Sequence, residues 1–266
     1  MRKKIESIIN NSLFYNPIRF NPISDFIIET SKKKTSKTII YYSSFLDIQS
    51  QNKLIFDIGA NKGNKVKAFL KMGFKVIAVE PEKKALSTLR WRFGKNKRVT
   101  IVGKGVSDQH GSATIHIAES RSGLNTLSDK WVNSLETETA KRGNKKPEFK
   151  KNYQIELTTL ANLYAEYGTP YFIKIDVEGF ENKVIKGMKQ LPAFISFETN
   201  LPEFREESIE CIQHLLGLSS KLIFNYSIGD KLESPKWLSA QEIIGTINNP
   251  EIRYMEIICD CKNVEM

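Results

Sequence analysis

The sequence predicts an α/β fold built on a mostly parallel, doubly wound sheet. Two observations support this prediction. From Asn52 onward, short apolar runs alternate with segments of helical periodicity. The runs are rich in Val and Ile and are apolar at consecutive positions, which is typical of parallel strands buried on both faces. Strands that alternate with helices form a parallel sheet with helices on both sides.

Each element follows from a local pattern. Turns that contain glycine separate the first strand from the first helix, and Gly73 ends that helix. A run with strict polar and apolar alternation at 111–118 follows a turn and predicts an added antiparallel strand. The expected elements are strand 53–57, helix 64–72, strand 75–79, helix 82–93, strand 98–102, strand 111–118, strand 171–175, helix 181–188, strand 193–198, helix 203–216, strand 221–226 and a last strand at 254–259.

The chain divides into an N-terminal appendage, residues 1–50, and a main domain, residues 51–266. The appendage is expected to hold a short helix, two Asn-Pro turns and a lysine-rich stretch. Residues 119–152 interrupt the alternation of strands and helices, carry many charges and lack clear periodicity. Because this stretch is too long for an ordinary connection, we expect a basic insertion that acts as a lid or substrate loop.

The charge of the chain is distributed unevenly. The formal net charge is +10, yet residues 196–266 hold twelve acidic and only six basic residues. Basic clusters at 32–37 and 141–151 predict attraction to an anionic acceptor, a membrane surface or nucleic acid, although a solvated surface also explains them. We expect a cytoplasmic protein, because no apolar run approaches the roughly 20 residues of a transmembrane helix and the N-terminus lacks a signal-peptide pattern.

The three cysteines, Cys211, Cys259 and Cys261, all lie in the last quarter of the chain. Their spacing matches neither a zinc site nor a redox motif, and an odd number argues against a disulfide framework. We therefore expect buried or spare thiols.

The turn after the first strand carries the strongest ligand signal. Gly59, Asn61 and Gly63 lie between this strand and the next helix, and glycines allow close approach of the backbone to a ligand. The glycine pattern of dinucleotide-binding proteins is absent, and Asp57 stands where a diphosphate would bind. A carboxylate suits a cationic ammonium or sulfonium group, and S-adenosylmethionine carries both. We expect these four residues to bind that cofactor.

Two further segments complete the expected cofactor site. Glu80 ends the second strand, where an acid accepts hydrogen bonds from both hydroxyls of a ribose. Val106 and Asp108 follow the third strand, over the crevice at which the strand order reverses. We expect Val106 to pack on an adenine ring and Asp108 to accept a hydrogen bond from its amino group. An Asx turn that opens the next hairpin also explains Asp108.

The segment after the expected strand 171–175 carries the reacting groups. Asp176 and Glu178 are two positions apart, so we expect both on one face at the carboxyl edge of the sheet. They could supply a general base or hold a divalent metal, and Lys174 on the same face could lower a carboxyl pKa or orient the substrate. We favour the metal-free alternative because the chain offers no obvious third ligand. Capping of the next helix also explains the two acids.

These motifs together resemble the FkbM family of class I methyltransferases. The resemblance is carried by Phe56-Asp57-x-Gly-x-Asn-x-Gly, by Val79-Glu80-Pro81 and by Lys-Ile-Asp-Val-Glu-Gly-x-Glu at 174–181, and it covers roughly residues 54–198. It implies a Rossmann-like sheet with an antiparallel C-terminal strand, S-adenosylmethionine as cofactor, and methyl transfer to a hydroxyl of a sugar, glycan or related metabolite. One departure is that Ala161 and Asn162 stand where the family commonly has an acidic residue.

Two alternatives compete with this interpretation. The basic first part of the chain favours a nucleic-acid methyltransferase, but enzymes that methylate base amino groups usually carry an Asn/Asp-Pro-Pro-aromatic motif at the fourth strand. This chain has Asp-Val-Glu-Gly at 176–179 instead. The second alternative is a binding module of the same fold without catalysis, which the intact Asp57, Glu80 and Asp176 disfavour. We therefore expect a small-molecule or glycan acceptor, with peripheral membrane contact left open.

Overall fold

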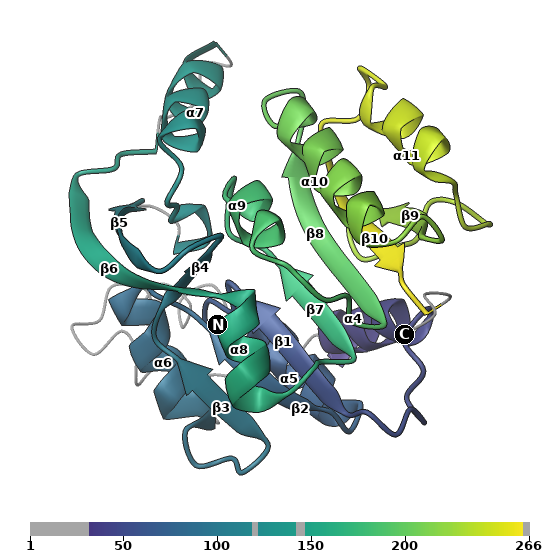
Figure 1. The fold of residues 1–266 in the computed structure, drawn as a ribbon. Coiled ribbons are helices and arrows are strands. Elements are labelled where there is room, and N and C mark those ends of the chain that lie inside the picture. Colours follow the sequence, from purple (N-terminus) through teal and green to yellow (C-terminus); the bar gives the residue numbers. More distant parts are fainter. Residues whose placement is uncertain (1–31, 119–121, 142–146, 263–266) are drawn as a thin grey trace.

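A seven-stranded sheet lies at the centre of the computed structural model, which describes residues 32–118, 122–141 and 147–262 (Figure 1). All neighbouring strands are parallel except β10, which is antiparallel to β8 and β9. The expected Rossmann-like sheet with an antiparallel C-terminal strand is thus confirmed, and the strand order reverses between β1 and β7. In sheet order the strands are β3 (Val99–Val102), β2 (Lys75–Val79), β1 (Leu54–Ile58), β7 (Phe172–Ile175), β8 (Phe194–Asn200), β10 (Tyr254–Asp260) and β9 (Ile223–Ser227).

Helices cover both faces of this sheet (Figure 1). Because side chains alternate along a strand, the strands contribute to two separate clusters of buried apolar residues, one on each face, and of the described strands in this sheet only β9 contributes to a single cluster. The first face carries α4 (Lys32–Ser43), α5 (Asn64–Lys71) and α6 (Lys83–Phe93). The second face carries α8 (Leu160–Tyr167), α9 (Glu181–Lys186), α10 (Arg205–Leu218) and α11 (Ala240–Ile247).

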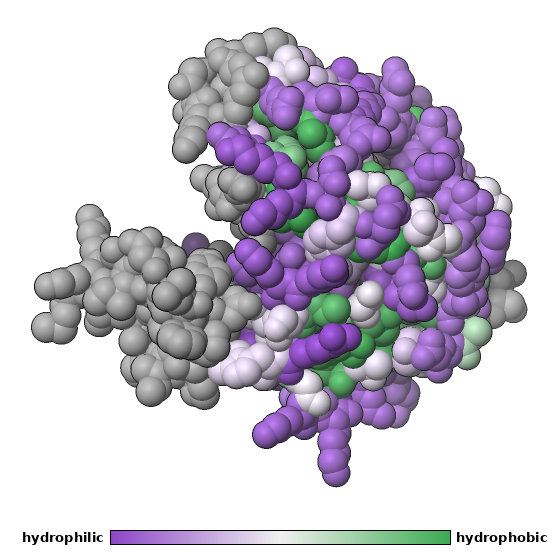
Figure 2. Space-filling model, turned by 90° about the vertical axis from the view of Figure 1, so that its left-hand side faces the viewer, coloured by the Kyte–Doolittle hydropathy of each residue, from purple (hydrophilic) through white to green (hydrophobic). Residues whose placement is uncertain are grey.

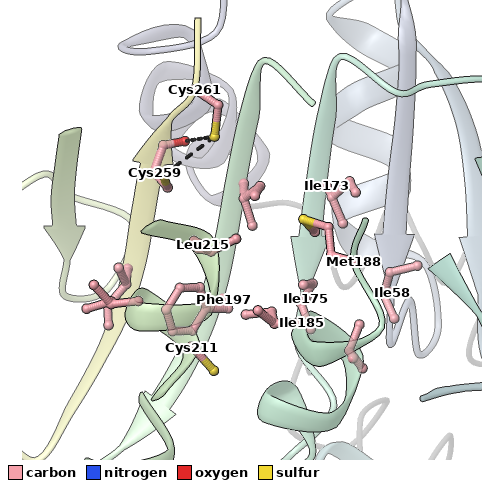
Figure 3. Packing of buried hydrophobic residues seen from close by; sticks show 14 of the residues in the cluster. Ile58, Ile173, Ile175, Ile185, Met188, Phe197, Cys211, Leu215, Cys259 and Cys261 are labelled. Carbon is pink, nitrogen blue, oxygen red and sulfur yellow. Dashed lines mark hydrogen bonds between the residues drawn. The ribbon is translucent and has the colours of Figure 1, made fainter. Parts of the chain in front are cut away.

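The larger cluster lies beneath α9 and α10 (Figure 3). Burial of each large apolar side chain there contributes roughly 1.5–3 kcal/mol. The sulfurs of Cys259 and Cys261 are 3.5 Å apart, and all three cysteines are buried free thiols, as expected. Strand and helix residues that meet in this cluster include Ile58, Ile173, Ile175, Phe197, Ile185, Met188, Cys211 and Leu215.

A small second sheet stands beside the central one. Its order is β4 (Gly105–Ser107), β6 (Lys151–Thr159) and β5 (Gly111–Ile117), and β5 is antiparallel to β6, which confirms the expected antiparallel strand. The irregular stretch expected at 119–152 contains instead η1 (Ser122–Leu124), helix α7 (Asp129–Lys141) and the first residues of β6. In β6 the apolar residues alternate with charged and amide residues, and the high charge of the surrounding segment obscures this pattern.

Helix α4 packs directly on the first face of the central sheet. Tyr41, Tyr42 and Phe45 are buried, and the ring of Tyr42 lies 4.8 Å from that of Phe69 in α5. The lysine-rich stretch of the N-terminal segment is therefore part of a helix whose later turns belong to the core. The two expected Asn-Pro turns and residues 142–146 of the basic cluster lie outside the described residues.

The surface is mainly polar. The face in Figure 2 is covered largely by hydrophilic residues, with apolar residues visible between them. Within the described ranges, no helix has both the length and the apolar character needed to cross a bilayer.

Candidate active site

A pocket opens at the carboxyl edge of β1 and β2, between the central and the small sheet. Its walls come from the turn after β1, the end of β2, β4, the segment 123–127 and the residues after β7. Six of the residues expected from the sequence line it: Gly59, Asn61, Glu80, Val106, Asp176 and Glu178.

The turn after β1 is shaped by two glycines with different surroundings. Gly59 has φ +82°, and a Cβ there would lie 1.8 Å from the carbonyl oxygen of Asp176, so only glycine allows β1 to approach the segment after β7. Gly63 has φ +77°, and its Cβ would meet Phe93 at 2.5 Å and Leu89 at 2.7 Å. Gly63 therefore serves the packing of α5 against α6 and does not line the pocket.

The Glu80 carboxylate binds the turn after β1 and the turn after β2, both next to the pocket. Its Oε2 accepts a hydrogen bond from the backbone N–H of Asn61, and its Oε1 accepts one from Glu82, both at 2.8 Å. Burial raises the pKa of Glu80 to about 7, and these backbone hydrogen bonds limit the increase. Each carboxylate oxygen can accept a second hydrogen bond. Glu80 is therefore held in place with acceptor capacity left for a ligand.

Residues after β3 contribute an apolar wall. Val106 of β4 and Ile115 of β5 line the pocket, together with Leu127. Asp108 does not line it: its carboxylate accepts a hydrogen bond from the Ser107 hydroxyl at 2.9 Å and lies 3.5 Å from the ammonium of Lys183. Burial acts to raise the pKa of Asp108, but these two contacts lower it below its usual value.

Asp57 lies behind the pocket rather than in its wall. It has the same orientation along β1 as Ile55, toward α5, and is 1% exposed. Its Oδ2 has no hydrogen-bond partner among the described residues. Burial raises the pKa of Asp57 to about 6, although the ammonium of Lys174 acts to lower it. Asp57 is therefore a buried carboxylate that does not line the pocket, contrary to the expectation of direct cofactor contact.

A buried ion pair lies beside the pocket. The ammonium of Lys174 is 2.6 Å from Oδ2 of Asp176, and the side chain of Lys174 is 1% exposed whereas that of Asp176 is 27% exposed. Burial acts to lower the pKa of Lys174, but the charges of Asp176, Glu198 and Asp57 raise it above its usual value. Lys174 therefore stays charged and holds one oxygen of Asp176, without itself lining the pocket.

Asp176 and Glu178 do not share one face of a strand, contrary to the expectation. Strand β7 ends at Ile175, and Glu178 has a left-handed backbone with φ +54°. The Thr126 hydroxyl donates a hydrogen bond to the Glu178 carbonyl at 2.6 Å. Burial and the charges of Asp176 and Glu198 raise the pKa of the Glu178 carboxyl well above its usual value.

The alternative that these two acids cap the next helix is also wrong. The N-cap position of α9 is occupied by Phe180, which makes no side-chain capping bond. Glu181 instead accepts hydrogen bonds from the backbone N–H groups of Val177 and Gly179, both at 3.0 Å. Asp176 and Glu178 are therefore left for another role.

Two acidic residues that the sequence reasoning missed lie next to Asp176. In β8, Phe197 pairs with Ile175 of β7, so the residues that follow them, Glu198 and Asp176, lie side by side. Glu256 of β10 lies one strand further on and pairs directly with Glu198. Glu198 ends an expected strand in the same way as Asp57 does, which is the signal that could have identified it. Within the described part of the chain, no three His, Cys, Asp or Glu side chains are grouped to hold a metal ion.

Comparison with solved structures gives distant matches only. Precorrin-6Y C5,15-methyltransferase from Geobacter metallireducens GS-15 is 11% identical with a TM-score of 0.42, covering 88% of this chain and 89% of that one. The plantazolicin methyltransferase BpumL in complex with SAH is 9% identical with a TM-score of 0.41, covering 97% and 98%. Fibrillarin from Aeropyrum pernix, with natively bound S-adenosyl-L-methionine, is 8% identical with a TM-score of 0.41, covering 85% and 74%. Likeness at this level carries no information about the acceptor of this chain.

Comparison with known sequences is more informative. None of the curated proteins matches the chain. A family model described as the methyltransferase FkbM domain matches residues 57–226, from the end of β1 to β9. This match confirms the resemblance carried by the sequence motifs, and it spans well over half of the chain. The protein therefore belongs to the FkbM family of methyltransferases.

Proposed function

We propose that the protein transfers a methyl group from S-adenosylmethionine to a hydroxyl of a neutral sugar, glycan or related metabolite. The observation that carries this proposal is the continuity of the pocket. The same pocket is lined by Glu80, in the position of a ribose-binding acid, and by Asp176, next to a row of carboxylates.

The pocket residues fit the cofactor. The pocket brings backbone, carboxylate and apolar side-chain groups together at the carboxyl edge of β1 and β2, where ligands bind in sheets of this type. Glu80 has acceptor capacity for the two ribose hydroxyls, and Val106 and Ile115 offer an apolar surface to an adenine ring. The unpartnered oxygen of Asp57 and the carboxylate of Asp176 supply negative charge beside the cationic methionine end. When bound, the cofactor supplies a methyl group on a positively charged sulfur.

The segment 122–141 covers one side of the pocket. Residues 123–127 form part of its wall, and the Thr126 hydroxyl is bonded to the backbone at Glu178. The Trp131 ring of α7 packs edge-on against Phe204, with ring centroids 5.6 Å apart. These contacts hold the cover against the central domain, where it excludes water from the reacting groups.

The charge at the acceptor end favours a neutral acceptor. Asp176, Glu198, Asp57 and Glu256 lie near one buried cation, Lys174, so the local charge is negative when the carboxyls are ionised. Like charges repel at short range, which disfavours a phosphate group or an acidic sugar there. Carboxylates are strong acceptors for hydroxyl protons. We therefore propose a neutral polyhydroxylated acceptor and not the anionic acceptor suggested by the net charge of the chain.

Two assays test this function. Calorimetry with S-adenosylmethionine and with S-adenosylhomocysteine should show saturable binding, and absence of binding by both would refute the cofactor assignment. Transfer of a labelled methyl group should then be measured with three acceptor panels: neutral glycosides, acidic or phosphorylated sugars, and RNA. Transfer to a neutral glycoside hydroxyl is expected, and transfer confined to RNA or to acidic sugars would refute the acceptor class.

The role of Asp176 has its own test. Asp176→Asn keeps the shape of the side chain but removes its charge. Cofactor binding should weaken only modestly in this variant, because Glu80 and the apolar wall remain, while turnover falls by roughly 10²-fold, the scale on which misplacement of a reacting group lowers the rate. Full turnover by Asp176→Asn would exclude Asp176 from the chemistry.

A further inference from the structure

Three carboxylates lie side by side on neighbouring strands at the edge of the sheet. Asp176 follows β7, Glu198 lies on β8 and Glu256 on β10, and register places each beside the next. Adjacent strands are about 4.8 Å apart. Like charges in directly opposed positions destabilise a sheet, so stability alone does not account for this carboxylate row of Asp176, Glu198 and Glu256.

The two outer members of the carboxylate row have partners. One oxygen of Asp176 contacts the Lys174 ammonium at 2.6 Å. Both oxygens of Glu256 accept hydrogen bonds, Oε2 from the Tyr41 hydroxyl at 2.9 Å and Oε1 from the Ser196 hydroxyl at 2.6 Å. Asp176 is therefore fixed in place, and Glu256 is 5% exposed and enclosed in the core.

The middle member differs from both. Glu198 is neither fully buried nor held by an ion pair within the described part of the chain, and the hydroxyl of Tyr254 is the uncharged group beside it. The charges that face Glu198 are those of Asp176, Lys174, Glu256 and Glu178. Glu198 does not line the pocket itself but follows the strand partner of Ile175, beside Asp176, which does. Its carboxylate accepts a hydrogen bond from the Tyr254 hydroxyl, and two carboxylate oxygens can accept more than one such bond, so acceptor capacity remains for a ligand.

We propose that the acceptor hydroxyl binds between Asp176 and Glu198, and that Glu198 is the catalytic residue that takes its proton. This assignment rests on the proposed methyltransferase function and deepens it by naming the base. Asp176, held by Lys174, orients the hydroxyl and is not the base.

Methyl transfer replaces the bond between carbon and sulfur by a bond between carbon and oxygen. A lone pair of the acceptor oxygen forms the new bond to the methyl carbon, and the bond between that carbon and sulfur breaks with its electron pair left on sulfur. The acceptor proton moves to a carboxylate oxygen of Glu198, which becomes a neutral carboxylic acid. Neutralisation of Glu198 also relieves its repulsion from Asp176 and Glu256, so its surroundings favour proton uptake.

The surroundings of Glu198 match this role. Burial and the charge of Asp176 raise the pKa of Glu198 to about 8. A general base works best when its pKa lies near the working pH. We expect kcat/KM of the wild-type enzyme to rise with pH and to level off above an apparent pKa near 8.

The test compares Glu198→Gln with Glu198→Asp and Glu256→Gln, with the neutral glycoside of highest turnover in the panel above as acceptor. Glu198→Gln should bind S-adenosylmethionine within about 3-fold of wild type but lose at least about 100-fold in kcat. Glu198→Asp should recover part of this loss and keep the acidic limb of the pH profile. Glu256→Gln removes a like charge but no contact to the acceptor, so its kcat should be near wild type and its acidic limb should move to lower pH.

Failure of this inference is separable from failure of the methyltransferase assignment. Absence of methyl transfer by the wild type would overturn the proposed function. Normal transfer by the wild type together with at least one third of wild-type kcat in Glu198→Gln would overturn only the role of Glu198. Should Glu198→Gln fail to fold, the wild-type profile decides, because a kcat/KM that is flat between pH 6 and pH 9 excludes a base in this carboxylate row.

Discussion

Glu80 makes two contributions. Its carboxylate holds the backbone N–H groups of Asn61 and Glu82, and it lines the pocket where the ribose is proposed to bind. Replacement by alanine removes both acceptors and leaves two N–H groups without their partner. A buried donor left unsatisfied costs about 1–3 kcal/mol, so Glu80→Ala should lose about 2–4 kcal/mol of unfolding free energy, part of the cost being offset by relief of a buried charge.

Glu80→Gln is the milder change. The amide keeps one acceptor oxygen and removes the charge, whose burial is reflected in the pKa of about 7 for Glu80. Its nitrogen leaves one of the two backbone N–H groups without an acceptor, so we expect a loss of about 1–3 kcal/mol of stability without ligand, smaller than that of Glu80→Ala. Each hydrogen bond to a charged group is worth about 1.5–3 kcal/mol, so loss of one ribose contact should weaken cofactor binding by about 10- to 150-fold.

Glu82 provides the matched control. It lies two positions further on, and its carboxylate caps α6 by accepting hydrogen bonds from the N–H groups of Lys84 and Ala85. Glu82→Gln should cost about 1 kcal/mol of stability and leave cofactor affinity unchanged. Calorimetry and denaturant unfolding measure the two quantities. Wild-type affinity in Glu80→Gln would refute the assignment of the ribose to Glu80.

Three further outcomes follow from the same structure. Gly59→Ala should lose at least about 3 kcal/mol of unfolding free energy, because its Cβ would lie 1.8 Å from a backbone oxygen. Gly73→Ala, at φ +93° with open space around it, should lose only about 1–2 kcal/mol. Equal melting temperatures of the two variants would contradict this difference. Lys174→Met should destabilise by about 3 kcal/mol by leaving buried carboxylates without their cation, whereas Lys186→Met, at an exposed ion pair, should stay within about 1 kcal/mol in denaturant unfolding. The unfolding free energy of the ligand-free protein should fall as pH rises from about 6 to 8, because the folded state keeps protons that the unfolded state has already released. A melting temperature that rises over this range would show that buried carboxyl groups do not control the pH dependence. The groups responsible are Asp57, Glu80, Glu181 and Glu198, whose pKa values are raised to between about 6 and 8.

Local patterns in the sequence predict much of the fold and part of the site. Continuous Val and Ile runs predict β1, β2 and β7 because strands buried on both faces need apolar residues at every position. The acids that end such runs can be placed at one edge without knowledge of the strand order, since parallel strands share the edge at which they end. Glu80 and Asp176 were identified in this way, and both line the pocket.

The tertiary structure decides which of those acids meet. The order β1-β7-β8-β10 places Asp176, Glu198 and Glu256 side by side, although 22 and 58 positions separate them along the chain. The tertiary structure also places the Asp57 side chain on the face of β1 that packs against α5, behind the pocket. Side chains of β1 point alternately to the two faces, and Asp57 shares its face with Ile55. Strand order and register arise from long-range packing, and no local pattern encodes them. The sequence therefore determines that acids end the buried strands. Only the folded arrangement decides which of these carboxylates is held by Lys174 and which is enclosed in the core, because both depend on contacts between strands far apart in the chain.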